Sequence, residues 1–114
     1  MHELSVTENI LEIAVRHAEQ AKAKKVTDIF IVIGSLSSIV DDSVSFYWDI
    51  ISEDTICHES KLHFKRIPAE LECIECGNKY TIESGLSACT SCGSAKVKVI
   101  SGEEFFLDSI EIER

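Results

Sequence analysis

CIECG at residues 73–77 and CTSCG at residues 89–93 decide how this chain folds. Each stretch sets two cysteines three positions apart, a spacing typical of a tight turn that directs both sulfurs toward one point. The twelve residues between the pairs suffice for a short hairpin that brings the turns together. Four sulfurs around one centre form the tetrahedral ligand set of a closed, structural Zn²⁺ site. We therefore predict zinc binding by Cys73, Cys76, Cys89 and Cys92.

Two other uses of the four cysteines compete with zinc. The same thiolates can hold iron, as in rubredoxin-like electron carriers. Disulfides need an oxidising compartment and usually a signal peptide. The first ten residues, MHELSVTENI, have neither a basic region nor an apolar segment of that kind. The sequence therefore favours a cytoplasmic metal site over disulfides, and the iron alternative stays open.

The charge balance restricts the possible partners. Twenty acidic residues against eleven basic ones give a net charge of −9 at pH 7. Many four-cysteine zinc ribbons bind nucleic acid, but a strongly acidic chain repels phosphates. No apolar stretch approaches the roughly 20 residues that span a bilayer. We therefore expect neither a nucleic acid nor a membrane as partner.

Two amphipathic helices are predicted from the spacing of apolar residues. Ser5-Val6-Thr7-Glu8 fits a capping box with Ser5 as N-cap, and the helix that follows should end near Ala23. The second helix should be capped by Asp41, Asp42 or Ser43. Its apolar face is expected to consist of Val44, Tyr47, Trp48 and Ile51.

The remaining pattern predicts strands on both sides of the cysteine segment. These strands are Thr27–Ile33, Leu62–Ile67, Tyr80–Ile82, Lys96–Ile100 and Glu104–Ile112. The expected fold class is α/β (α+β), with two helices on a small three-stranded mixed sheet and an inserted four-cysteine, zinc-ribbon-like domain. Residues 1–68 plus 98–114 should form the α/β domain, and residues 69–97 the zinc-binding domain.

The first three residues, Met1-His2-Glu3, offer a second set of metal ligands. Because His2 is too bulky for routine removal of the initiator methionine, the free amine should belong to Met1. That amine, the imidazole of His2, nearby backbone amides and the Glu3 carboxylate could converge on one cation. Nitrogen-rich, planar coordination suits Ni²⁺ and Cu²⁺ better than Zn²⁺. On spacing alone, a solvated histidine on a frayed terminus explains the same residues.

Taken together, these features resemble the HypA/HybF family over essentially the whole chain. The resemblance is carried by Met1-His2-Glu3, the capped helix, the strand Thr27–Gly34, the segment Gly34–Ser37, the late cysteine pairs and the closing residues Ile110–Glu113. It implies a nickel metallochaperone that helps to load the [NiFe] centre of hydrogenase large subunits together with the GTPase HypB, with urease as a possible second client. It places the nickel site on Met1, His2 and Glu3, and the zinc site on the four cysteines. We expect a monomer or a weak homodimer.

The sequence departs from the family pattern at two places. Some relatives carry a histidine beside each cysteine pair, whereas here Gly77-Asn78 and Gly93-Ser94 follow the pairs. Exchange of a cysteine ligand for histidine is therefore not expected. Some relatives also have an acid facing the nickel terminus, at a position that Val40 holds here.

No enzyme is expected from the other candidates. Cys57 is followed by His58, but a catalytic Cys–His pair needs adjacency in space, so Cys57 is interpreted as a small hydrophobic residue. The sequence has no phosphate-binding loop and no nucleophile elbow. The alternative function, from a different class, is a zinc-ribbon adaptor that contacts proteins without transferring nickel.

Overall fold

The computed structural model describes residues 3–82 and 87–114, which form two compact units. The helical unit comprises residues up to Val32, Ile39–Lys65 and Phe106–Arg114. The cysteine unit comprises Ile33–Ser38 and Arg66–Phe105. The domain boundaries expected from the sequence stay a prediction, because compact units are defined by contacts and not by independent folding.

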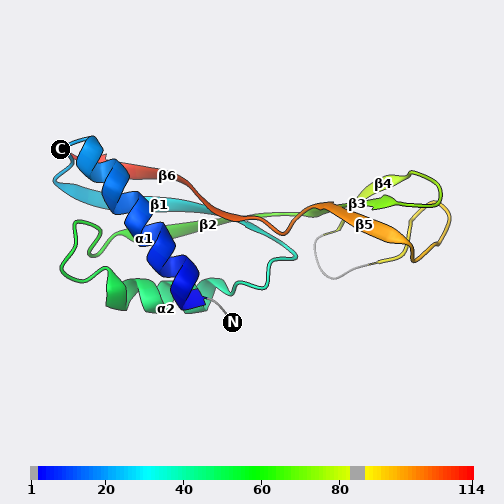
Figure 1. Ribbon diagram of the computed structural model, residues 1–114, viewed down its shortest axis with the longest axis horizontal. Coiled ribbons are helices and arrows are strands. Elements are labelled where there is room, and N and C mark those ends of the chain that lie inside the picture. The colour runs from blue at the N-terminus through cyan, green and yellow to red at the C-terminus, as the bar shows by residue number, and fades with distance from the viewer. Residues whose placement is uncertain (1–2, 83–86) are drawn as a thin grey trace. The chain divides into compact units, whose positions relative to one another are not determined.

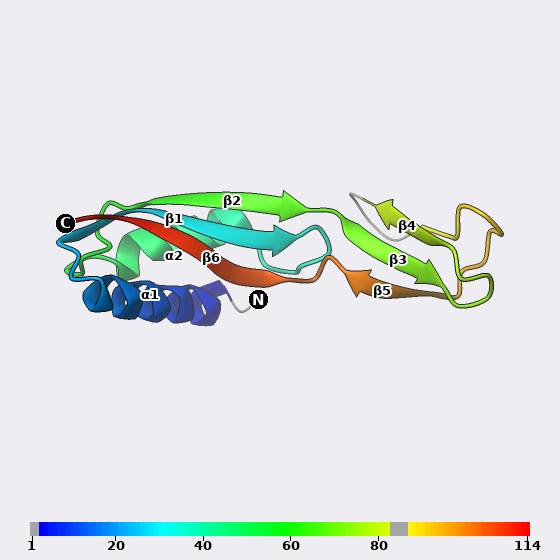
Figure 2. The same ribbon diagram turned by 90° about the horizontal axis from the view of Figure 1, so that it is seen from above.

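The helical unit consists of two helices and a three-stranded sheet. Its helices are α1 (Glu3–Gln20) and α2 (Asp41–Ile51), and its sheet has the order β2 (Lys61–Ile67), β1 (Lys25–Gly34) and β6 (Phe105–Glu113). Figure 2 shows β1 and β2 running in the same direction and β6 in the opposite one, so the sheet is mixed. The predicted fold class, two helices with a small mixed sheet, is confirmed.

The central strand and one face of each helix form the core of this unit. In β1, Ile29 and Ile31 are fully or almost fully buried, as expected for a β-branched strand between two neighbours. Trp48 is 1% exposed, and Val44 is fully buried one turn earlier on α2. Tyr47 and Ile51, predicted on the same apolar face, are only half-buried.

The predicted limits of α1 are wrong at both ends. The helix already includes Glu3, so Ser5 lies inside it and is not its N-cap. The buried hydroxyl of Thr7 donates to the carbonyl of Glu3, one helical turn earlier, so Ser5 lies within the turn that this bond spans. At the other end the helix stops at Gln20, three residues before Ala23.

A left-handed residue explains why α1 stops early. Lys22 has φ +57°, and its N–H donates to the carbonyl of Glu19 over 3.0 Å. The N–H of Ala23 donates to the carbonyl of Ala18 over 2.9 Å. These two bonds form a Schellman motif, which satisfies the last carbonyls of the helix and turns the chain toward β1.

The N-cap of α2 also differs from the prediction. Val40 holds this position with extended backbone (φ −102°, ψ 119°) and no capping side chain. Its carbonyl accepts the first helical bond from the N–H of Val44 over 3.1 Å. Asp41 and Asp42 lie in the first turn, where their negative carboxylates interact favourably with the positive end of the helix dipole.

The cysteine unit has its own antiparallel sheet, with the order β4 (Lys79–Ile82), β3 (Ala69–Cys73) and β5 (Val97–Ser101), shown in Figure 1. Leu71 is fully buried at its centre, opposite Tyr80 of β4 and Val99 of β5. The central strand β3 was not among the predicted strands. It carries the first zinc-ligand candidate, Cys73, at its end.

Gly34 and Gly102 make a close backbone approach in this unit. A side chain on Gly34 would lie only 2.0 Å from the carbonyl oxygen of Gly102. Gly102 itself has φ +117°, and a side chain there would lie 2.5 Å from the Cα of Ala69. The N–H of Leu36 donates to the carbonyl of Gly102 over 2.8 Å, which fixes this approach.

Candidate metal centre

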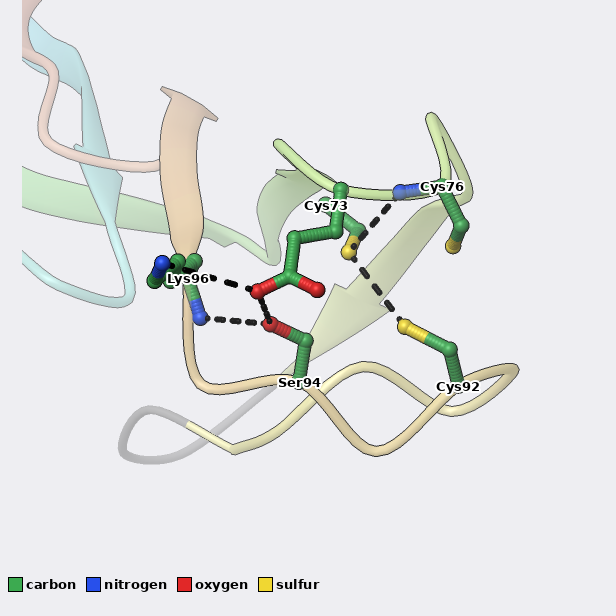
Figure 3. A network of polar contacts seen from close by, with 6 residues as sticks. Cys73, Cys76, Cys92, Ser94 and Lys96 are labelled. Carbon is green, nitrogen blue, oxygen red and sulfur yellow. Dashed lines mark hydrogen bonds and ion pairs between the residues drawn. The ribbon is translucent and has the colours of Figure 1, made fainter.

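The four predicted zinc ligands lie together at one end of the cysteine unit. The Sγ atoms of Cys73 and Cys92 are 3.6 Å apart, as are those of Cys76 and Cys89 (Figure 3 shows the first pair). All four sulfurs lie within 4.8 Å of one another. Cys73 and Cys89 are buried, whereas Cys76 and Cys92 are exposed. Among the described residues this is the one group of histidine, cysteine or acidic side chains arranged to hold a metal ion.

Each cysteine pair is built into the same type of turn. The N–H of Gly77 donates to the carbonyl of Cys73 and that of Gly93 to the carbonyl of Cys89, both over 2.9 Å. Both glycines adopt left-handed backbone, with φ +78° and +75°. This backbone conformation favours glycine directly after the second cysteine of each pair.

Backbone amides inside the turns point at the sulfur of the first cysteine. The N–H of Cys76 lies 3.5 Å from the Sγ of Cys73, and the N–H of Cys92 lies 3.5 Å from the Sγ of Cys89. These donors stabilise thiolates. The amide of Cys92, with further help from that of Ser91, lowers the pKa of Cys89 to about 6.

The pKa values of the other three cysteines follow from their donors and from the neighbouring sulfurs. The amide of Cys76 lowers the pKa of Cys73. A backbone hydrogen bond from Ser94 acts to lower the pKa of Cys92, but the sulfurs of Cys76 and Cys73 outweigh it and raise that pKa to about 12. At Cys76 the backbone hydrogen bond from Asn78 is the largest single influence and acts to lower the pKa, but the sulfur of Cys89 together with burial outweighs it and raises the pKa. Crowded sulfurs without a cation resist joint ionisation, which is the electrostatic condition that a divalent cation relieves.

The sulfur positions fit a tetrahedral metal ion. With Zn–S bonds of about 2.3 Å, neighbouring sulfurs of a tetrahedral site lie about 3.8 Å apart. The Cys73–Cys92 and Cys76–Cys89 sulfur pairs, at 3.6 Å, come near this value. The four cysteines therefore suffice to hold Zn²⁺ with no other protein ligand.

The predicted nickel site can be described only at Glu3. Met1 and His2 lie outside the described residues, and Glu3 is the first residue of α1. Val40, which the resemblance places opposite the nickel terminus, is half exposed and precedes α2.

Cys57 is not one of the four cysteines of the metal centre. Its side chain is fully buried in the helical unit, and this burial raises its pKa to about 11. A protonated, inaccessible thiol is a poor nucleophile. The interpretation of Cys57 as a small hydrophobic residue agrees with this burial.

Comparison with known proteins identifies the family. Residues 1–112 match the family described as "Hydrogenase/urease nickel incorporation, metallochaperone, hypA". The chain belongs to the HypA family. The hydrogenase maturation factor HypA of Dehalococcoides mccartyi is 44% identical over 113 residues, which cover 99% of this chain and 95% of that protein. The corresponding factor of Caldanaerobacter subterraneus is 41% identical over 114 residues and covers 99% of this chain and 100% of that protein.

Solved HypA structures share the fold. The solution structure of the Ni metallochaperone HypA from Helicobacter pylori has a TM-score of 0.68 at 25% identity and covers 99% of this chain and 98% of that chain. A second HypA solution structure has a TM-score of 0.72 at 26% identity and covers 98% and 96%. As a HypA member the chain is a nickel-incorporation protein for hydrogenase maturation. In the described ranges no helix combines the length and apolar character needed to cross a membrane.

One residue at the metal centre was missed by the sequence analysis. The side-chain amide of Asn78 donates to the Sγ of Cys89 over 3.6 Å and to the hydroxyl of Thr90 over 3.1 Å. Asn78 had been noted only because a histidine is absent there. Its position two residues after Cys76 was a weak signal, since a short amide side chain at that point can reach across to a neighbouring turn.

Proposed function

We propose that this chain binds Ni²⁺ through its amino terminus and delivers it for maturation of [NiFe] hydrogenase. The observation that carries the proposal is the match to the nickel-incorporation family from residue 1 onward, in a chain that begins Met1-His2-Glu3. The amine of Met1 and the imidazole of His2 supply nitrogen ligands, and Glu3 supplies a carboxylate. This donor set suits Ni²⁺.

The four cysteines have a different role in this proposal. They hold Zn²⁺ in a closed site that keeps the cysteine unit folded, while the nickel site is open and exchanges its ion. A carrier must bind its cargo firmly enough to acquire it and loosely enough to release it. We place the protein in the cytoplasm, with a HypB-type GTPase and the hydrogenase large subunit as partners and urease as a further client. It acts as a carrier without catalysis of its own, as a monomer or weak homodimer.

A nickel titration of protein with an authentic, untagged start tests the proposal. His2→Ala, or one residue added before Met1, should abolish nickel binding while zinc content stays near one per chain. His17→Ala is the matched control, because it removes a histidine in the last turn of α1 and should leave the nickel isotherm unchanged. An unchanged isotherm in the extended protein would refute the terminal site.

The same titration should depend on pH. Nickel affinity is expected to rise between about pH 6 and 8, because an imidazole with a pKa near 6.5 and an amine with a pKa near 7.7–8.0 must lose protons to bind the metal. A flat profile would argue against amine and imidazole ligands. If the native protein ignores Ni²⁺ but keeps its zinc, the adaptor function becomes the better explanation.

A further inference from the structure

The two cysteine turns are nearly equivalent in their backbone. The N–H of Cys73 donates to the carbonyl of Asn78 over 2.8 Å, and the N–H of Cys89 donates to the carbonyl of Ser94 over 2.9 Å. Together with the matching glycine bonds, this makes Asn78 and Ser94 equivalent positions, one at the end of each turn. Because the backbones match, a comparison of the two side chains shows which contacts each one contributes to the metal centre.

Both side chains reach across to the opposite turn, but they contact different groups. The hydroxyl of Ser94 donates to the carboxylate of Glu75 over 3.1 Å, and Lys96 lies 3.9 Å from the same carboxylate oxygen (Figure 3). The amide of Asn78 instead contacts the sulfur of Cys89, a metal ligand. The side chain of Ser94 thus links the turns without contacting a cysteine sulfur, whereas the side chain of Asn78 links them through one.

The sulfur of Cys89 has three N–H donors. The backbone amides of Ser91 and Cys92 lie 3.4 Å and 3.5 Å away, and the side chain of Asn78 adds the third. In the part of the chain that the structure describes, the other N–H donors to cysteine sulfur are backbone amides. Asn78 therefore provides a donor that a single substitution can remove without changing the backbone.

We propose that Asn78 is a positioning residue of the metal centre, which fixes the sulfur of Cys89 and reduces its electron donation to the metal. The inference rests on the proposed tetrathiolate zinc site. Four thiolates around one divalent ion leave a net charge of about −2, and N–H donors stabilise this charge. Without the donor from Asn78, the thiolate of Cys89 should be more basic and donate more electron density to the metal. Because its position is also less fixed, it should be displaced more easily by a competing ligand.

Co²⁺ is a suitable probe because its sulfur-to-metal charge-transfer absorption reports on the thiolates directly. Asn78→Leu keeps a side chain of similar size and removes the donor. We expect this band to move to longer wavelength in Asn78→Leu and a chelator to compete for zinc about 10-fold more effectively. Asn78→Asp, which also lacks the N–H and adds a negative charge, should change both readouts in the same direction and serves if Asn78→Leu does not fold.

Ser94→Ala is the matched control, because it removes the equivalent cross-turn hydrogen bond without touching a sulfur. The charge-transfer band of the cobalt-loaded Ser94→Ala variant should have the same wavelength as that of the parent protein. If the Asn78 variants leave the band unmoved, or if Ser94→Ala shifts it equally, the assigned role is wrong while the zinc site stands. If the parent protein itself takes up no Co²⁺ with thiolate charge-transfer absorption, the zinc site fails and the inference fails with it.

Discussion

The indole N–H of Trp48 donates a hydrogen bond to the hydroxyl of Ser60 over 2.9 Å, and both residues are buried. The same hydroxyl donates to the carbonyl of Cys57 over 2.6 Å. Ser60 thus connects the largest buried side chain of the helical unit to the loop that follows α2. A buried indole needs such an acceptor, because water cannot replace it.

We expect Ser60→Ala to destabilise the protein by about 1–3 kcal/mol, because it leaves the buried N–H of Trp48 unsatisfied. Urea unfolding followed by tryptophan fluorescence measures this loss. Ser5→Ala is the control: as an exposed position inside α1, it should change stability by less than about 0.5 kcal/mol. A loss near 1 kcal/mol for Ser5→Ala would restore Ser5 as a helix cap.

Gly102→Ala should strongly destabilise the cysteine unit, because the added methyl group would lie 2.5 Å from the Cα of Ala69 in a backbone conformation with φ +117°. Gly77→Ala is the comparison, since it also has positive φ but nothing within 4 Å of an added side chain. The Gly77 variant should lose only the left-handed strain, about 1–2 kcal/mol. Equal losses in the two unfolding curves would show that the close approach at Gly102 adds nothing.

Loss of the metal ligands should affect the two units differently. We expect Cys73→Ala to abolish zinc retention and to unfold the cysteine unit, because the small β4–β3–β5 sheet depends on the metal for its stability. Amide signals of α1, α2 and β1 in a ¹H–¹⁵N spectrum should stay dispersed. Cys57→Ala is the control that removes a cysteine while zinc content is retained. Collapse of the whole spectrum in Cys73→Ala would contradict the separate stability of the helical unit.

The pair Asp28–His63 should make stability depend on pH. The Nε2 atom of His63 lies 2.8 Å from a carboxylate oxygen of Asp28, and this contact, with help from Thr27, lowers the pKa of Asp28. A carboxyl whose pKa is lower in the folded state than in the unfolded state stabilises the folded protein at pH values above the unfolded-state pKa of about 3.9. This stabilisation is lost as the pH falls through the pKa of the folded state.

Asp28→Asn should therefore lower the melting temperature slightly between pH 5 and 7, and the difference from the parent should shrink below about pH 4. Thermal unfolding across this range measures it, with the exposed Asp108→Asn on β6 as the control. A difference that stays constant down to about pH 2 would show that the ionised carboxylate of Asp28 is not what stabilises the pair.

Short stretches of sequence were enough to predict two strands of the first sheet and the cysteine turns, but not the start of α1. Strand β1 could be predicted because a β-branched run ends at Gly34, and β2 because an alternating run ends at Pro68. The convergence of the cysteines could be predicted because a Cys-x2-Cys turn closes on its own backbone. The start of α1 could not, because the local capping pattern at Ser5 gives no sign that Glu3 and Leu4 are already helical.

Contacts between segments were harder to predict. The alternation from Ala69 to Cys73 is typical of a strand, but it follows directly on Pro68 and is only five residues long. Its place at the centre of the second sheet depends on two partners that come later in the chain. Likewise, the contact of Asn78 with Cys89 exists only once both turns meet.

The backbone hydrogen bonds that close each cysteine turn lie within that turn, although the N–H of Ile74 also donates to the carbonyl of Lys96. Each turn is a ready bidentate chelator, so an incoming ion can be captured by two sulfurs before the other two arrive. By the same geometry, the two sulfurs of one turn could release an ion while the two sulfurs of the other turn still hold it. Small competing thiols would then remove the ion fastest while only one turn holds it, and the rate of loss would depend on how often the two turns separate.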